Sequence, residues 1–301
     1  MDAGKTLRIA AGLMLAWAGA ASAELAMSWG VAASPRAVGG DTFSASDNAR
    51  NPGYAPQADW IGLNGGEGFK PWKAEGRLPG ATRMVATDGG FQFKAGEPAG
   101  EMAMIRGLDT TAGLDSGTFS VTMWGAMGGA DEPGDFAGFA VYGKDGGSYS
   151  ELFRWGVAIM EGQAIPESFA YSLDGGTSYV SIHPGSGYPS GGVDYSLTWA
   201  LVEGGTMQIG LSAADTSTGG AFFGDCAVEV ETADRVMAIA AVLTESGRYS
   251  GQGDGSEMQF DNVTVTGHEP VPAPAVPEPG TLGLLAAGLA ALLGRRAKRG
   301  R

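Results

Sequence analysis

The sequence contains few of the residues that most often carry catalytic or metal-binding chemistry. Cys226 is its one cysteine, so the chain cannot form an internal disulfide, and two histidines are too few for a histidine-rich metal site. Basic residues are also scarce: 19 lysines and arginines stand against 33 acidic residues, which gives a net charge of −14. Because so acidic a surface repels phosphate groups, we expect no nucleic-acid partner.

Glycine, in contrast, is abundant. The 52 glycines show no collagen-like triplet period, and they are spread through a chain that is 44% hydrophobic, which is enough to build a core. From Asp41 to Thr266, polar and apolar residues alternate with a period of two, and Gly, Asp or Ser interrupts the alternation at short intervals. This pattern predicts an all-β fold, an antiparallel β-sandwich of the jelly-roll type.

Five segments show the strand pattern most clearly, and Gly-rich turns separate the strand-like runs. The segments are Thr118–Trp124, Val193–Val202, Thr206–Ser212, Cys226–Glu231 and Arg235–Leu243. The last is apolar on both faces, which favours a central buried strand, with a short helix as the alternative. The predicted turns are Asp145-Gly146-Gly147, Asp174-Gly175-Gly176 and Glu203-Gly204-Gly205.

Residues 1–23 have the three parts of a secretory signal peptide. Lys5 and Arg8 give a positive start, an apolar stretch follows, and Ala21-Ser22-Ala23 forms a small-residue cleavage site. We therefore expect a helical signal peptide with Ala21 and Ala23 at the cleavage site. A buried N-terminal helix is the alternative.

The other end of the chain changes in composition. Residues 268–276 form a proline-rich linker, which favours an extended tether. Residues 277–301 then join an apolar stretch, shorter than the roughly 20 residues of a comfortable transmembrane helix, to a cluster of arginine and lysine. We expect a short hydrophobic helix there, with its basic end retained on the cytoplasmic side of the membrane.

This tail resembles the PEP-CTERM sorting signal. Pro277, Glu278 and Pro279, the following Gly280, the short apolar helix and the basic end all match that pattern. The resemblance implies a protein that is exported, anchored transiently in the inner membrane and processed there by the protease exosortase. It would then be attached to the cell surface or released, often in strains that make extracellular polysaccharide.

The middle of the chain shows a looser resemblance. Residues 47–72 are similar to a segment near the start of many PEP-CTERM proteins. Residues 136–157 and 257–267 resemble concanavalin-like or laminin-G-like sandwiches. The resemblance implies one lectin-like domain over residues 24–267 and does not fix a ligand.

Glu229 and Glu231 are the residues that best suit an enzyme. One residue apart on a strand, the two carboxylates would share a face, as the nucleophile and acid of a retaining glycosidase require. The alternative is a solvated outer face on a very acidic protein.

Asp41 and Asp261 are candidate ligands for a structural calcium ion. Lectin-like sandwiches often hold calcium with an Asp of the last strand and oxygens of the first, and Ca²⁺ prefers carboxylates and carbonyls. The alternation also slips between Phe260 and Val263, which predicts a bulge at Asp261-Asn262. A capped turn or an outward charge is the alternative for Asp261.

Trp124, Tyr142 and Tyr179 are candidate carbohydrate-binding residues. Trp124 and Tyr142 are out of phase with the apolar residues of their strands, and Tyr179 alternates with polar residues, so outward rings could stack on sugars. Packing on the second face of a sheet is the alternative.

Together these patterns favour an exported, non-enzymatic surface or matrix protein that binds exopolysaccharide. A secreted glycoside hydrolase or lyase that uses Glu229 and Glu231 is the alternative function. A purely structural matrix component is a third.

The sorting interpretation makes a direct prediction about the mature protein. Cleavage at the PEP-CTERM signal should remove the apolar segment and the basic end, because both serve only to stop export. Mass spectrometry of the extracellular protein should therefore find no peptide that ends at Arg301. Recovery of that peptide from the mature protein would contradict the processing.

Overall fold

The computed structural model describes much of the region between the two ends of the chain. The described residues are 40–54, 59–77, 83–87, 89–94, 100–126, 133–145, 147–162, 167–184, 192–245 and 257–271. The chain divides into two units, Met1–Pro270 and Val271–Arg301. The predicted signal peptide and sorting helix lie outside the described residues, as does most of the second unit.

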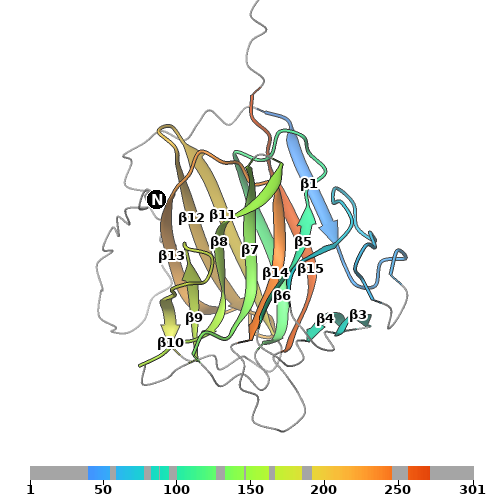
Figure 1. Cartoon of the computed structure of the whole chain (residues 1–301), viewed down its shortest axis with the longest axis vertical. Coiled ribbons are helices and arrows are strands. Elements are labelled where there is room, and N and C mark those ends of the chain that lie inside the picture. Colours follow the sequence, from blue (N-terminus) through green and yellow to red (C-terminus); the bar gives the residue numbers. More distant parts are fainter. Residues whose placement is uncertain are drawn as a thin grey trace, which may run out of the picture. The chain divides into compact units, whose positions relative to one another are not determined.

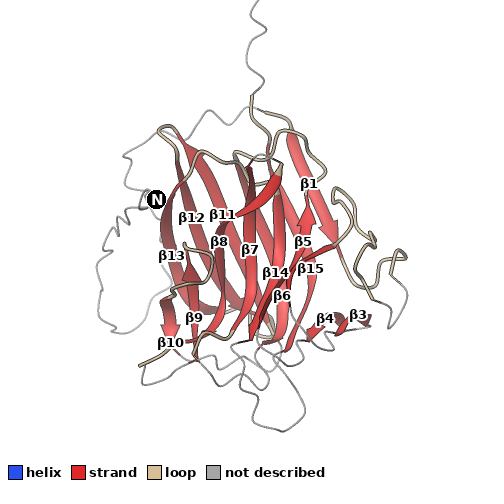
Figure 2. Cartoon of the chain, viewed as in Figure 1, coloured by secondary structure: helices blue, strands red, loops and turns tan. Residues whose placement is uncertain are grey.

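The described part of the first unit is a β-sandwich of fifteen strands in two antiparallel sheets (Figures 1 and 2), as the alternation predicts. The eight-stranded sheet has the order β13 (Ala221–Glu231), β12 (Thr206–Asp215), β11 (Val193–Val202), β6 (Ser116–Ala126), β15 (Glu257–His268), β4 (Gly90–Lys94) and β3 (Arg83–Thr87), with β1 (Thr42–Asp47) also paired to β15. The seven-stranded sheet has the order β10 (Val180–Pro184), β9 (Glu167–Ser172), β8 (Ser148–Ile159), β7 (Phe136–Asp145), β14 (Ala238–Glu245), β5 (Gly100–Gly107) and β2 (Lys73–Arg77).

The core lies between the sheets, where the inward residues of the alternating segments meet. Phe119 of β6 packs against Phe139 of β7 and Trp155 of β8, with ring centroids 5.6 and 5.4 Å away. The predicted central strand is β14, which lies between β7 and β5 and is buried on both faces. The strand prediction for this segment is therefore confirmed from Ala238 onward, and residues 235–237 precede the strand.

The glycine-rich turns supply backbone conformations that other residues rarely adopt. In the turn between β11 and β12, Gly204 and Gly205 have φ values of 101° and 80°. A residue with a Cβ would be strained at both positions. The hairpin therefore depends on the paired glycines that the sequence places there.

The segment between β1 and β2 is organised by a buried ion pair. A nitrogen of the Arg106 guanidinium lies 2.9 Å from a carboxylate oxygen of Asp47, and both side chains are 0% exposed. Arg106 also donates hydrogen bonds to the Tyr54 hydroxyl (2.7 Å) and to the side-chain Oδ1 of Asn64 (2.6 Å). Its guanidinium lies 4.9 Å from the centres of the Phe69 and Trp72 rings.

Tyr54 connects this ion pair to the aromatic core. Its hydroxyl donates to Asp47 (2.5 Å) and accepts from the indole nitrogen of Trp72 (2.9 Å). Burial, and to a lesser extent Asp47, raises the pKa of Tyr54 to about 12 against the opposing charge of Arg106. The Trp72 ring in turn packs edge-on against Trp60, 4.7 Å away. Described residues of the segment 47–72, which resembles a segment of PEP-CTERM proteins, thus supply this network.

Removing the charge of Arg106 should destabilise the protein severely. Arg106→Leu leaves the Asp47 carboxylate buried without its partner, a change that typically costs about 3–5 kcal/mol. Urea denaturation of the mature protein should show that loss in the free energy of unfolding. Lys144→Leu, at an exposed site on β7, is the matched control and should change it by less than about 0.5 kcal/mol. Equal effects of the two changes would contradict the structural role of the pair.

Candidate functional site

A β-bulge brings two charged residues of β8 to one face. In a regular strand, residues three apart point to opposite sides. The pairing of β7 with β8 shifts between Val141 and Tyr142, so that Val141 faces Phe153 and Tyr142 faces Glu151. Leu152 is the extra residue, and Glu151 and Arg154 therefore both lie on the outer face of the seven-stranded sheet.

Arg154 reaches across that face to a third strand. Its guanidinium makes two hydrogen bonds to Glu151 (2.6 and 2.7 Å) and two to Glu101 of β5 (2.7 and 3.0 Å). Small residues on the intervening strands, such as Ala140 and Ala240, leave room for the side chain. Burial alone would lower the pKa of Arg154, but hydrogen bonds and charges from both glutamates outweigh burial and raise it.

Two of the predicted aromatic residues meet at this cluster. Tyr142 donates a hydrogen bond to Glu151 (3.1 Å), and Tyr179 stacks on Phe136 with ring centroids 5.2 Å apart. Burial raises the pKa of Tyr142, and it raises that of Tyr179 to about 12 despite the charge of Arg154. Tyr142 lies outside the main core, as predicted from its phase, but is 7% exposed.

This cluster is polar but closed. Four hydrogen bonds of Arg154 go to the two glutamates, and Thr244 donates a further one to Glu101 (3.0 Å). Because Tyr142 is buried, its ring is not available for stacking on a sugar. Glu101 is the more exposed of the two glutamates, at 41% of its side chain, but its carboxylate is already bonded to Arg154. We therefore assign the cluster a structural role. Arg154 and the two glutamates could not be recognised as a cluster from the sequence, because the bulge that brings Glu151 and Arg154 to one face gives no clear break in the alternation.

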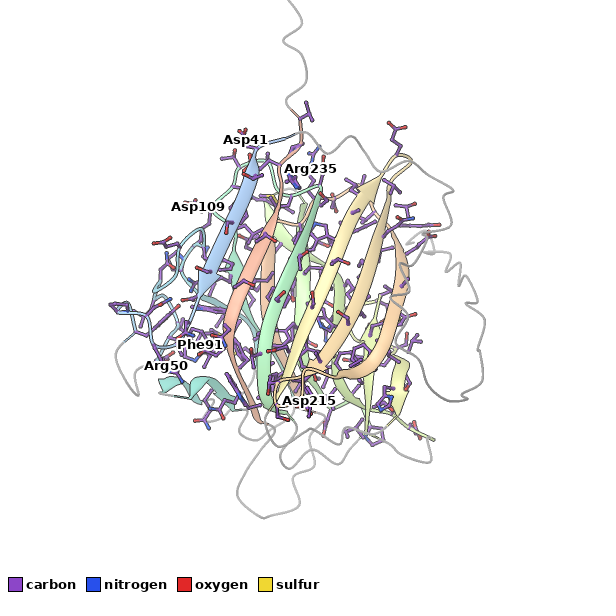
Figure 3. All side chains as sticks on the ribbon, turned by 180° about the vertical axis from the view of Figure 1, so that it is seen from behind. Asp41, Arg50, Phe91, Asp109, Asp215 and Arg235 are labelled. Carbon is purple, nitrogen blue, oxygen red and sulfur yellow. The ribbon has the colours of Figure 1, made fainter. Side chains whose placement is uncertain are left out.

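The outer face of the eight-stranded sheet, by contrast, contains an open groove of about 570 Å³. Figure 3 views the molecule from this side, with β1, β15, β6, β11 and β12 side by side and Asp215 labelled at the end of β12. The groove crosses β6, β11 and β12, and Gly219 of the turn after Asp215 also lines it. Its outward polar side chains are Ser120, Thr122, Asp194, Ser196, Ser212 and Asn262.

Trp124 is not one of the residues that line the groove, but it lies near the groove, two residues beyond the lining residue Thr122. It follows Thr122 on the same outward face of β6 and is half-buried. Gly192, at the start of β11, has φ 95°, and a Cβ there would lie 2.7 Å from the Trp124 ring. The indole therefore packs closely on backbone that only glycine allows. Of the three predicted aromatic residues, Trp124 is the one on an open polar surface.

A chain of hydrogen bonds connects the groove to the segment after β1. Thr122 donates to Asp194 across the strand pair (2.6 Å), and Asn262 donates to the Thr122 hydroxyl (3.4 Å). Asn48 then donates to the side-chain oxygen of Asn262 (2.7 Å). Asn262 has φ 54° and lies in the predicted bulge of β15, where the pairing with β6 shifts between Asp261 and Thr264. The bulge prediction is confirmed.

Asp41 and Asp261, predicted together as calcium ligands, do not meet. Because β1 and β15 are antiparallel, Asp41 lies beside Glu269, whose amide donates to its carbonyl (3.0 Å). Asp261 lies near the opposite end of β1, where its carboxylate accepts a hydrogen bond from the amide of Ala49 (2.8 Å). Figure 3 labels Asp41 at one end of β1 and Arg50 beyond the other. Among the described residues, no group of three or more Asp, Glu, His or Cys could hold a metal ion.

Glu229 and Glu231 do share one face of β13, as the alternation predicts. Val228 and Val230, which alternate with them, are buried on the inner side, and both glutamates are exposed on the outer side of the sheet. β13 is the last strand of the sheet order, and Glu229 accepts a weak hydrogen bond from Gln208 (3.5 Å). Neither glutamate lines the groove.

Comparison with known proteins identifies the end of the chain. Residues 275–299 match the PEP-CTERM protein-sorting motif. This match confirms the sorting signal recognised in the sequence, and the motif implies an exported surface protein that exosortase processes. In the part of the chain that the structure describes, we find no helix with the length and apolar character of a membrane span.

Comparisons of the remainder are remote. No curated protein sequence matches the chain. Similar solved structures include the exoplasmic/lumenal domain of VIP36 bound to Ca²⁺ and Man3GlcNAc, with 8% identity, TM-score 0.41, and coverage of 69% of this chain and 89% of that chain. A legume lectin-like domain from Entamoeba histolytica has 11% identity, TM-score 0.40 and coverage of 66% and 90%. An alginate lyase from Pseudomonas aeruginosa has 12% identity, TM-score 0.38 and coverage of 62% and 86%. We transfer neither ligand nor activity from these.

The buried Asp261 predicts a pH-dependent difference in stability. Burial raises the pKa of Asp261, and hydrogen bonds from the Ala49 and Asn262 amides offset this only in part. A carboxyl whose pKa is raised on folding binds its proton more readily in the folded state. The folded wild type should therefore gain stability as the pH falls through that raised pKa toward the ordinary value of about 3.9.

The Asp261→Asn variant cannot take up this proton, but its side-chain oxygen can still accept the hydrogen bond from the Ala49 amide. The free energy of unfolding of wild type minus that of this variant should be larger at pH 5 than at pH 7, as measured by urea denaturation. A wild-type advantage that stays constant or grows with pH would contradict the effect of burial.

Proposed function

We propose that the mature protein is a non-enzymatic surface or matrix component that binds neutral polysaccharide in the groove beside Trp124. Export through the signal peptide, transient anchoring in the inner membrane and removal of the tail by exosortase would bring it there. Exopolysaccharide outside the cell is the proposed ligand. The observation that carries the proposal is an open groove in which, apart from Asp194, the outward polar side chains are hydroxyls and one amide, with a partly exposed indole nearby.

The chemistry of the groove suits a sugar. Hydroxyl and amide groups both donate and accept hydrogen bonds, as sugar hydroxyls require. Asp194 is the one charged residue among those that line the groove, and it already accepts a hydrogen bond from Thr122. A neutral ligand fits such a lining better than an anionic polymer, which the net charge of −14 would repel.

Trp124 supplies the apolar part of the contact. A sugar ring has a face of C–H groups that can lie against an indole, and aromatic contacts contribute about 0.5–1.5 kcal/mol beyond the area they bury. The ring is held in place by its packing on Gly192, so little side-chain entropy is lost on binding. The groove and the ring together give the polar and stacking halves of a carbohydrate site.

The binding proposal predicts opposite roles for Trp124 and Glu229. Trp124→Ala should weaken polysaccharide binding by about tenfold, because the stacking surface is lost. Affinity electrophoresis of the mature protein through gels containing glucan, mannan or galactan would measure the change. Glu229→Gln should bind like wild type, since Glu229 lies on β13 outside the groove.

The same variants test the enzymatic alternative. A glycosidase that uses Glu229 would release reducing sugar slowly from the polymer and would lose that activity in Glu229→Gln, because a neutral amide cannot transfer a proton or act as nucleophile. Hydrolysis that disappears with this change would overturn the binding proposal. Tyr179→Ala, in the closed cluster on the other sheet, is a second control and should leave retention unchanged.

A further inference from the structure

The outer face of the eight-stranded sheet has two rows of hydroxyl side chains that run across its strands. Each row follows the antiparallel register, so its members lie directly opposite one another on neighbouring strands. The first row is Ser44, Thr266, Thr118 and Thr198, on β1, β15, β6 and β11. The second is Ser46, Thr264, Ser120, Ser196 and Ser212, which continues onto β12.

The spacing of these rows follows from the geometry of a sheet. Neighbouring strands lie about 4.8 Å apart, and residues two apart on one strand are separated by about 7 Å. Each row therefore presents a hydroxyl at roughly every 4.8 Å across four or five strands, and the rows run side by side. Ser44, Ser46, Thr198 and Thr266 are exposed, and the other five side chains are half-buried.

Neither row includes a charged residue, although the protein carries 33 acidic residues. Beyond the rows, carboxylates return at Asp194 and at Glu229 of β13. A cation or a basic peptide would be drawn to those carboxylates rather than to the hydroxyl rows. The uncharged rows match a partner that is itself uncharged and rich in hydroxyl groups.

The groove and the rows are continuous. Ser120, Ser196 and Ser212 of the second row line the groove, while Thr264 and Ser46 extend that row beyond it toward β1. A ligand held beside Trp124 would therefore meet further hydroxyls if it extended across β15. A short oligosaccharide would end within the groove, whereas a polymer would continue along the row.

We infer that the protein binds an extended, neutral polysaccharide chain that lies across the strands along these hydroxyl rows, starting from the groove. This inference rests on the proposed function and adds the length and direction of the ligand. The protein recognises internal stretches of a long chain, and a few sugar units fill only part of the surface. Affinity should accordingly rise from a trisaccharide to the polymer of the same sugar.

The test removes hydroxyls outside the groove while keeping side-chain shape. Thr264→Val with Thr266→Val replaces two row hydroxyls by methyl groups. Thr264→Ser with Thr266→Ser keeps both hydroxyls and is the matched control. The ligand is the glucan, mannan or galactan polymer that retards wild type in affinity electrophoresis, compared with a trisaccharide of the same sugar by calorimetry.

We expect the double valine variant to bind the polymer about tenfold more weakly and the trisaccharide as wild type does, because each lost hydrogen bond contributes modestly to affinity. The double serine variant should bind both like wild type. Trp124→Ala, in contrast, should weaken both ligands. Circular dichroism and the melting temperature of each variant would exclude a folding defect.

Four results would overturn the inference. If the double valine variant binds the polymer as tightly as wild type, or if wild type binds trisaccharide and polymer equally, the rows take no part and the groove proposal stands alone. If wild type binds none of the polymers, the proposed function fails and the inference fails with it. If wild type instead forms dimers that Thr266→Lys dissociates, with polymer binding unchanged, the face is an interface between two copies.

Discussion

Burying a guanidinium is costly unless its charge and most of its hydrogen-bond donors are met by partners. In Arg106 the two terminal nitrogens have such partners among the described residues and the buried Nε has none, so these partners constrain the fold. Its partners Asp47, Tyr54 and Asn64 all come from β1 and the segment that follows it, far from β5 in sequence. The chain after β1 must therefore fold over the C-terminal end of β5, where Arg106 lies, rather than continue as a strand. That closure brings Trp72 and its aromatic neighbours into the core.

The same closure determines the shape of the outer face. Once Asp47 is held by Arg106, the next residues reach the bulge of β15: Asp261 accepts the Ala49 amide, and Asn48 meets Asn262. Asn262 in turn contacts Thr122, whose hydroxyl bonds Asp194 at the groove. A buried charge between the sheets is thus connected, through short polar contacts, to the surface on which we place the ligand. Residues 47–72 are structural in this sense, and their effect on binding is indirect.

The strands could be predicted because half-buried strands alternate in sequence, and Val193–Val202 coincides with β11 residue for residue. The bulge at Asp261 was also visible as a slip in that alternation. Contacts that depend on register were not predictable: nothing local pairs Arg106 with Asp47, or Arg154 with Glu101 across three strand pairings. Asp41 and Asp261 were predicted together because lectin-like sandwiches often hold calcium between the last strand and the first, but the antiparallel pairing of β1 with β15 places them at opposite ends. The hydroxyl rows arise in the same way, since each strand contributes only one or two polar residues whose alignment requires the sheet.

The two outer faces of the sandwich differ in their charged residues. On the seven-stranded sheet, Arg154 is matched by two glutamates, so the polar groups there satisfy one another and leave little for a ligand. On the eight-stranded sheet, the two rows contain no charged residue and present hydroxyl groups at the surface. In the absence of a partner these hydroxyls are hydrated. Exchanging such water for sugar hydroxyls changes the free energy little per contact. Strong binding on this face must therefore come from many repeated contacts along a polymer, which is what rows across several strands provide.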